Sequence, residues 1–482
     1  MLKRQRQTST NIRFWIALLT GKLVALLCRL FRRSGTSLPG VIALKIHPQL
    51  LSVLAANYER IVAVTGTNGK TTTANLITHL LRSSGLSTAS NYEGANMLSG
   101  VVTALIKDCT ILGKRPSQFA VLEVDEGNVG KVFSSVKPDL VVVTNYFRDQ
   151  LDRYSDLDHN INLLRQVLVD LPQTMLLLNA DDPLVVIAGR DHSVVSYYGA
   201  IREQKEQTGS YDIKEVNLCP DCGTGLSYYY YNYGQLGDYY CSNCAFRRPV
   251  PDFLASEIED GDFLEFNLHV CQRKGFNDKS STASTVRFRA QMQGLYNIYN
   301  ILAAAAAAIT LGVSQQTITA SLMEYVAASG RMEKFIFKGR ISTVNLIKNP
   351  IGLNEVIKTL LRGKGEKALV IAINDLAGDG RDVSWLWDAG FEMLDNPLIK
   401  MIVCSGRRAG DVAVRLKYAG ISLHKIVIEP ECGESIEILG EQDAEEYHIL
   451  ASYTCVFNYA KLLRKMGEAV EIDADQSLPS LS

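Results

Sequence analysis

Short apolar runs alternate with segments of helical periodicity along most of the chain. The run at 61–64 is followed by 74–81, where apolar residues recur at helical spacing. Similar runs lie at 119–124, 140–144 and 175–179, and the region after residue 335 repeats the pattern. Alternating strand and helix signals predict an α/β fold with mainly parallel sheets.

These signals also divide the chain into consecutive parts. We predict an N-terminal segment at 1–45, a first α/β domain at 46–335, a C-terminal α/β domain at 336–475 and a tail at 476–482. In the C-terminal domain the strand signals lie at 368–373, 399–404 and 426–428. Each α/β domain is long enough to bury a core of its own.

The N-terminal segment has a pattern of its own. Residues 1–35 carry basic side chains and no acidic one. The apolar residues that follow a helical repeat are Ile16, Leu19, Leu23, Leu26, Leu27 and Leu30. No uncharged run is long enough to span a bilayer. Two interpretations remain open: a helix packed on the first domain, or a basic amphipathic helix resting on an anionic membrane.

Composition narrows the class of protein. The 482 residues include 50 basic and 51 acidic ones, which gives no general attraction to nucleic acid. An apolar content of 47% is typical of a globular protein. We see no cleavable signal peptide, so we expect a cytoplasmic protein despite its ten cysteines, at the inner face of the membrane if the N-terminal segment rests there.

A glycine-bearing loop joins the strand at 61–64 to the next helix. It reads Gly66-Thr67-Asn68-Gly69-Lys70-Thr71-Thr72. Glycines let backbone N–H groups approach a polyphosphate, and the helix N-terminus adds partial positive charge. Lys70 can reach the outer phosphates, and the Thr71 hydroxyl can hold Mg²⁺. The loop predicts a nucleotide phosphate site; the alternative is an ordinary strand-to-helix turn.

Two CxxC pairs lie in a tyrosine-rich stretch at about 215–250. Cys219 and Cys222 form the first pair, and Cys241 and Cys244 form the second after eighteen intervening residues. This spacing is typical of a zinc ribbon with four thiolate ligands. Because no histidine lies near, we interpret the metal as structural Zn²⁺ in an inserted module. A redox dithiol pair is the alternative.

The sequence GTNGKTTT at 66–73 resembles the Mur ligase family, ATP-dependent enzymes that join an amine to a carboxylate through an acyl phosphate. The resemblance implies that Glu123 holds Mg²⁺, Asn179 and Asp182 lie near the nucleotide, Asn297 and Asn300 lie near the adenine, and Arg331 lies against the γ-phosphate. For Asn179 and Asp182 the alternative is an Asx turn with a helix cap. For Arg331 it is a lone surface side chain.

The chain departs from the family pattern at several points. Gln150 and Tyr296 stand where histidines are usual, and Lys348-Asn349-Pro350 replaces a segment with aspartate and histidine. The loop DGRDVSWLWD at 379–388 and the inserted ribbon are further distinguishing features. Together these features resemble a branch of the family that amidates the α-carboxylate of D-glutamate in the lipid II stem peptide.

That resemblance implies a heterodimer with a GatD-type glutamine amidotransferase subunit that supplies ammonia. An aspartate of the C-terminal domain would complete the partner's cysteine and histidine. Asp382 is our first match for it and Asp379 our second, so the candidate catalytic residues are Asp382, Lys70 and Arg331. A cap on the helix that starts near Val383 is the alternative role for Asp382.

Two rival functions remain at this stage. An ordinary Mur or folylpolyglutamate-type ligase would add an amino acid without a partner. A nucleotide-regulated zinc-ribbon protein would bind nucleic acid, which the balanced charge disfavours.

Overall fold

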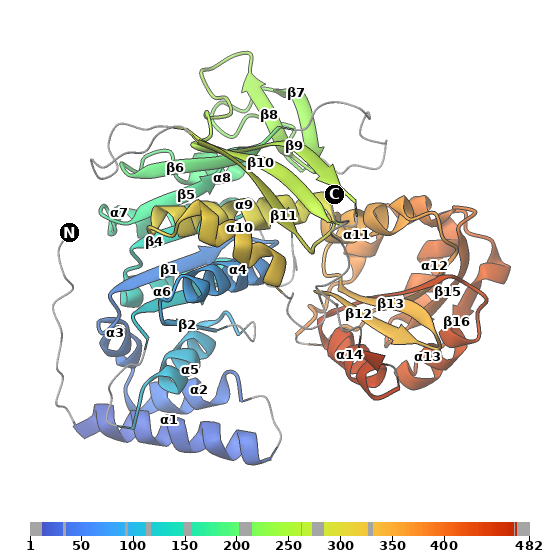
Figure 1. Ribbon diagram of the computed structural model, residues 1–482, viewed down its shortest axis with the longest axis horizontal. Helices are drawn as coiled ribbons and strands as arrows, with labels where there is room; N and C mark the ends of the chain where they lie inside the picture. Colours follow the sequence, from blue (N-terminus) through green and yellow to red (C-terminus); the bar gives the residue numbers. More distant parts are fainter. Residues whose placement is uncertain are drawn as a thin grey trace, which may run out of the picture. The chain divides into compact units, whose positions relative to one another are not determined.

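A nine-stranded sheet forms the centre of the first part of the chain, in the order β11-β10-β9-β6-β5-β4-β1-β3-β2 (Figure 1). Neighbouring strands are parallel from β2 to β9, whereas β10 is antiparallel to both β9 and β11. The strands are β1 (Arg60–Thr65), β2 (Thr88–Ser90), β3 (Phe119–Glu123), β4 (Leu140–Val143), β5 (Met175–Asn179), β6 (Val195–Ala200), β9 (Phe253–Asp260), β10 (Leu264–Val270) and β11 (Ser284–Ala290).

The computed structural model describes residues 12–31, 35–91, 95–111, 117–148, 157–201, 215–261, 263–271, 284–325, 331–376, 378–466 and 468–469. The chain forms two units, 1–326 and 327–482, which are described separately. The division falls before the expected boundary at 335/336, because β12 (Arg331–Phe337) pairs with β13 (Arg340–Leu346) of the second unit. The expected tail at 476–482 lies outside the described residues.

Helices cover the sheet of the first unit, which explains why its central strands are continuous apolar runs. In β1, every residue from Ile61 to Thr65 is buried, as expected for a parallel strand packed on both faces. The α/β fold predicted for this region is thus confirmed. The helices are α3 (Leu50–Ala55), α4 (Lys70–Ser83), α5 (Leu98–Asp108), α6 (Val129–Val136), α7 (Leu157–Val169), α8 (Pro183–Ala188), α9 (Leu295–Thr310) and α10 (Gln315–Glu324).

The N-terminal helix α1 (Ile12–Leu30) packs on α2 (Leu38–Ile46) and α5 of the first unit. Its buried residues are Phe14, Ala17, Leu18, Gly21 and Cys28. The apolar stripe that the sequence singled out lies on the opposite side and is exposed. Within the described residues, no helix has the length and apolar character needed to cross a membrane.

A two-stranded hairpin is inserted between β6 and β9. Its strands are β7 (Leu226–Tyr233) and β8 (Leu236–Cys241), and the tyrosines stack in pairs, Tyr228 on Tyr231 and Tyr229 on Tyr240. A buried ion pair connects it to the sheet, because Arg248 Nε lies 2.6 Å from Asp181 Oδ1, just beyond β5. Asp181 also accepts a hydrogen bond of 2.6 Å from the Tyr299 hydroxyl of α9.

The second unit has a seven-stranded sheet in the order β16-β15-β14-β17-β13-β12-β18. Leu369 and Ile371 of β14 pack in one core cluster, and Ala368 and Val370 pack in another on the opposite face. The strands predicted near 368, 399 and 426 are present. The elements are β14 (Lys367–Ala372), β15 (Ile399–Ser405), β16 (Ile426–Ile428), β17 (Glu446–Ala451), β18 (Glu468–Ala469), α11 (Pro350–Arg362), α12 (Ala409–Tyr418), α13 (Cys432–Gly440) and α14 (Tyr453–Met466).

Candidate functional site

The loop between β1 and α4 requires glycine at two positions. Gly66 and Gly69 have φ of 122° and 82°, a region that side chains disfavour. A Cβ on Gly66 would meet Thr144 Oγ1 at 2.4 Å, and one on Gly69 would meet Asn300 Oδ1 at 2.1 Å. The backbone of the loop is therefore closely surrounded by β4 and α9. This conformation directs the loop into the N-terminus of α4, as the nucleotide interpretation requires.

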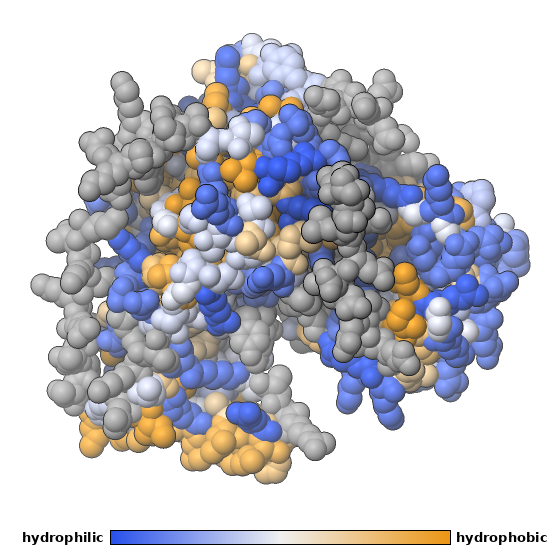
Figure 2. Space-filling model, in the orientation of Figure 1, coloured by the Kyte–Doolittle hydropathy of each residue, from blue (hydrophilic) through white to orange (hydrophobic). Residues whose placement is uncertain are grey.

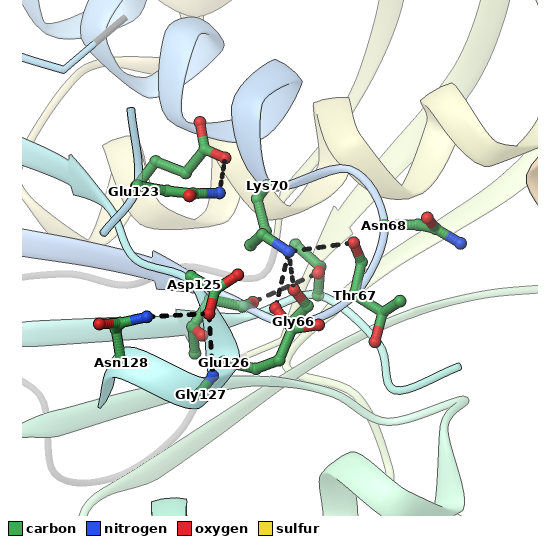
Figure 3. Close-up of polar contacts among 12 residues, drawn as sticks. Gly66, Thr67, Asn68, Lys70, Glu123, Asp125, Glu126, Gly127 and Asn128 are labelled. Carbon is green, nitrogen blue, oxygen red and sulfur yellow. Dashed lines mark hydrogen bonds and ion pairs between the residues drawn. The ribbon is translucent and has the colours of Figure 1, made fainter. Parts of the chain in front are cut away.

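Lys70 follows this loop as the first residue of α4, and its side chain is buried (Figure 3). Its Nζ donates to the carbonyl oxygens of Gly66 and Thr67 and to Glu126 Oε2, the last at 2.8 Å. Burial alone would lower the pKa of Lys70, but the Glu126 and Asp125 carboxylates outweigh it and raise that pKa above its ordinary value. Lys70 is therefore a fixed cation beside the glycine loop, and its contact with phosphate stays a prediction. No sequence pattern singles out Glu126 as its partner.

Glu123 ends β3 and is buried beside the same loop. Asn96 Nδ2 donates to Glu123 Oε1 at 3.0 Å, while Glu123 Oε2 is buried and has no hydrogen-bond partner. A buried carboxylate oxygen without a donor is costly unless a cation binds it. Its environment therefore fits the Mg²⁺ ligand that the resemblance implies, with Thr71 at the start of α4 as the second candidate.

The loop after β4 holds the glycine loop from outside, a role that the sequence interpretation missed. Asn145 Oδ1 accepts from Asn68 N at 2.9 Å, and Asn145 O accepts from Thr67 N at 2.7 Å. The Thr67 hydroxyl donates to Phe147 O at 3.1 Å. These bonds fix the backbone of 67–68. Of the segment that follows, Gln150 lies outside the described residues.

Asn297 and Asn300 lie on one face of α9, as their spacing of three predicts. Asn300 Nδ2 donates to Asn297 Oδ1 at 2.9 Å, and the Thr73 hydroxyl of α4 donates to Asn300 Oδ1 at 3.4 Å. Both amides thus belong to the surroundings of the glycine loop. Their contact with adenine stays a prediction.

Asn179 and Asp182 have the contacts of the alternative that we left open, an Asx turn with a helix cap. Asn179 Oδ1 accepts from Asp181 N, and Asp182 Oδ1 accepts from Leu184 N at 2.9 Å to cap α8. Asp182 Oδ2 also accepts from Tyr146 N at 2.8 Å. Burial raises the pKa of Asp182 to about 7. A nucleotide contact for either residue stays a prediction.

The four cysteines come together at the base of the β7–β8 hairpin. All four Sγ atoms lie within 4.8 Å of one another, with 3.7 Å between Cys219 and Cys244 and 3.5 Å between Cys222 and Cys241. A tetrahedral thiolate site with a metal–sulfur distance of about 2.3 Å has sulfur–sulfur edges of about 3.8 Å. The thiols therefore fit Zn²⁺.

The second unit brings a polar loop, 374–382, to the carboxyl end of its sheet. Both carboxylate oxygens of Asp379 accept hydrogen bonds from Thr454. Oδ1 accepts from Thr454 N at 2.7 Å, and Oδ2 accepts from the Thr454 hydroxyl at 2.6 Å. Asp382 Oδ1 accepts from Ser384 N at 2.8 Å, the first residue of a short 3₁₀ turn whose N-cap is Val383, so this contact is close to the capping role named as the alternative without being an N-cap. Asp382 is nevertheless the less constrained of the two.

Two further predictions concern this unit. The strand that contains Arg331 is described, but its side chain lies outside the described part, so its γ-phosphate role stays a prediction. From the polar loop alone, the two tryptophans that follow it would both be expected to be exposed. Trp387 is 55% exposed, whereas Trp385 is partly buried against the core of the second unit.

Comparison with known proteins agrees with this geometry. Residues 64–243 match the Mur ligase middle domain, and 346–456 match the MurT ligase C-terminal domain. The fold resembles that of a pseudomurein peptide ligase type C from Methanothermus fervidus, with a TM-score of 0.63 and 23% identity over 84% of this chain and 78% of that one. MurF from Acinetobacter baumannii gives a TM-score of 0.61 at 20% identity, with coverages of 88% and 81%. The chain therefore has the Mur ligase fold.

Curated relatives define the branch. The lipid II isoglutaminyl synthase (glutamine-hydrolyzing) subunit MurT of Staphylococcus aureus (strain COL) is 36% identical over 86% of this chain and 90% of its own length. The subunit of that name from Streptococcus pneumoniae (strain ATCC BAA-255 / R6) is 32% identical over 94% and 97%. The chain belongs to the MurT family.

Proposed function

We propose that this chain is the ATP-dependent synthetase that converts the D-glutamate α-carboxylate of the lipid II stem peptide to D-isoglutamine, with ammonia from a GatD-type glutaminase subunit. The names of the relatives that match almost their full length support the substrate and the partner. One observation carries the ligase chemistry. Beside the glycine loop lie both a fixed cation, Lys70, and a buried carboxylate oxygen of Glu123 that has no hydrogen-bond partner. Action on a lipid-linked substrate would occur at the inner face of the membrane.

The reaction requires two displacements. A substrate carboxylate oxygen attacks the γ-phosphorus, the bond to the β–γ bridging oxygen breaks, and ADP leaves. Ammonia then attacks the acyl carbon, gives up a proton, and the C–O bond breaks to release phosphate. In the first step, Lys70 and the backbone N–H groups at the start of α4 hold the phosphates and offset developing charge, with Arg331 assigned to the γ-phosphoryl group. Glu123 and Thr71 would hold Mg²⁺, which supplies further positive charge at these oxygens.

The proposal requires a partner that supplies ammonia, whereas the rival Mur or folylpolyglutamate-type ligase would add an amino acid without a partner. A glutaminase with cysteine and histidine gains from a carboxylate that orients the histidine and stabilises its cationic form. Asp382 suits this role better than Asp379, whose two oxygens hold Thr454 at the start of α14. The exposed side chains of Trp387 and Tyr453 near this loop offer apolar surface to a partner.

The test uses the chain together with its GatD-type subunit, lipid II and ATP. We expect amidation with glutamine, and also with a high concentration of ammonium salt when the partner is omitted. Asp382→Asn should abolish the glutamine-driven reaction and retain the ammonium-driven one. Asp388→Asn, an exposed change six positions along, is the matched control and should retain both.

Other results would count against the proposal. Loss of both reactions in Asp382→Asn, with an unchanged melting temperature, would place Asp382 in the synthetase and remove its partner role. Amino-acid addition by the chain alone, without amidation, would favour the ordinary Mur or folylpolyglutamate-type ligase.

A further inference from the structure

The outward face of α1 carries a row of large apolar side chains. Its members are Ile12, Ile16, Leu19, Leu23, Leu26 and Leu30, each 47–72% exposed. They recur at steps of three or four and therefore form one stripe along the helix, which we call the α1 outer stripe. Figure 2 shows hydrophobic side chains gathered along this helix. Leu27 and Phe31, 42% and 74% exposed, widen the apolar surface.

The opposite face of α1 fixes the direction of this stripe. Gly21 lies so close to α5 that a Cβ at this position would meet Ile106 Cδ1 at 2.8 Å, and Ala43 Cβ of α2 would be 3.4 Å away. Phe14, Ala17 and Leu18 are buried in the core of the first unit. The helix cannot rotate to bury its outer side without losing these contacts. The α1 outer stripe is therefore held in solvent by the fold, and contiguous apolar surface of this kind marks an interaction site.

The charged residues in the sequence of this N-terminal segment are all basic. Residues 1–33 contain eight basic side chains and no acidic one. Within the described helix, Arg13 and Arg29 are exposed, and Lys22 donates to the carbonyl oxygens of Ile106 and Cys109. An apolar stripe beside basic side chains matches an anionic lipid surface, which attracts each cation near it. A second copy of this helix offers no acidic partner for these cations, so a stripe-to-stripe dimer is disfavoured.

We propose that the α1 outer stripe lies in the headgroup region of an anionic bilayer, with the helix axis along the membrane plane. The buried face of α1 then holds the first unit to the lipid surface. This proposal is independent of the amidation reaction, since it rests on the exposed faces of one helix. It also explains why both sequence interpretations of this segment apply at once: one face packs on the domain and the other faces lipid.

The test is sedimentation of the full-length chain with vesicles of phosphatidylcholine, with or without phosphatidylglycerol, and without lipid II. We expect binding to the anionic vesicles that weakens as salt is added. Replacement of two stripe residues, Leu23→Glu with Leu26→Glu, should lower the partition coefficient by about tenfold or more. The matched control is Leu423→Glu with Ile428→Glu, two changes of similar exposure in the second unit, which should bind like the wild type.

Three results would overturn the proposal. They are no sedimentation of the wild type with anionic vesicles, equal binding by the stripe variant, and a dimer in lipid-free solution that only the stripe variant loses. The last would assign the stripe to a second copy of the chain. All four substitutions are at exposed positions, so an unchanged melting temperature is expected and verifies that each variant is folded. Failure here would leave the amidation proposal unaffected.

Discussion

Lys70 Nζ and Glu126 Oε2 lie 2.8 Å apart, and both side chains are almost completely buried. Removal of one member of such a pair leaves the other charge without compensation. We therefore expect Lys70→Ala to lower the free energy of unfolding by about 3 kcal/mol, in addition to its loss of ATP turnover. Chemical denaturation and an ATPase assay measure the two effects separately.

The double variant Lys70→Ala with Glu126→Gln is the control for this effect. It removes both charges, so part of the stability should return while ATP turnover stays low. Equal stability of the single variant and the wild type would show that the pair has no energetic role. Near-normal amidation by Lys70→Ala would remove the phosphate-site assignment.

Gly69 and Gly85 allow steric effects to be separated from backbone strain. Both have positive φ, 82° and 85°, but a Cβ on Gly69 would meet Asn300 Oδ1 at 2.1 Å, and one on Gly85 would meet nothing within 4 Å. Gly85→Ala should therefore cost about 1 kcal/mol of stability with normal ATP affinity. Gly69→Ala should lower ATP affinity by about tenfold or more, because either the loop or Asn300 must move. Isothermal titration with ATP would check this, and equal affinities would contradict it.

Asp182 gives the folded chain a pH dependence with a definite sign. Burial raises its pKa from 3.8 to about 7, so the folded state holds a proton that the unfolded state releases between these values. Its contribution to stability is complete below pH 3.8 and is lost as pH rises through about 7. Asp182→Asn cannot titrate. Its stability relative to the wild type should therefore improve from pH 5 to pH 8, by up to about 1.4 kcal/mol per pH unit within the window. A pH-independent difference would refute this.

Metal content should follow the cysteine cluster. We expect one Zn²⁺ per chain, lost in Cys241→Ser together with a lower melting temperature, because thiolate ligation adds folding energy. Cys271→Ser changes an exposed cysteine outside the cluster and should keep both the metal and the melting temperature. Elemental analysis measures the zinc content per chain. Zinc-free wild-type protein after gentle purification would argue for the dithiol alternative.

Local motifs could be predicted from the sequence, whereas partners distant in the sequence could not. The glycine loop and the cysteine cluster are specified by residue types at short spacings. In the structure, the residues of each motif lie close to one another as predicted. Glu126 is different, because the last residue of β3 and two residues after it are acidic, and only the 3₁₀ turn at 126–128 decides which one reaches Lys70. The strand pair β12–β13 has a sequence signal that we missed, which is Gly339 in the turn between the strands. Lys338 and Gly339 both have positive φ, which is typical of a tight hairpin turn.

The orientation of α1 shows another limit of sequence patterns. Its helical repeat correctly groups the residues from Ile16 to Leu30 on one face. The opposite face, with Phe14, Ala17 and Leu18, is apolar as well, so periodicity alone cannot say which side is buried. Packing on α2 and α5 decides the question, because Gly21 permits the close approach that larger residues would prevent.

The ion pair between Asp181 and Arg248 has an evolutionary consequence. Asp181 lies just beyond β5 of the central sheet, while Arg248 follows the inserted hairpin in the chain, and their contact is buried. A lineage that gained or lost the insertion in small steps would pass through a chain with one unmatched interior charge, unless position 181 changed in the same step. Relatives that keep an aspartate at this position but lack the ribbon should therefore carry a different cation that replaces Arg248.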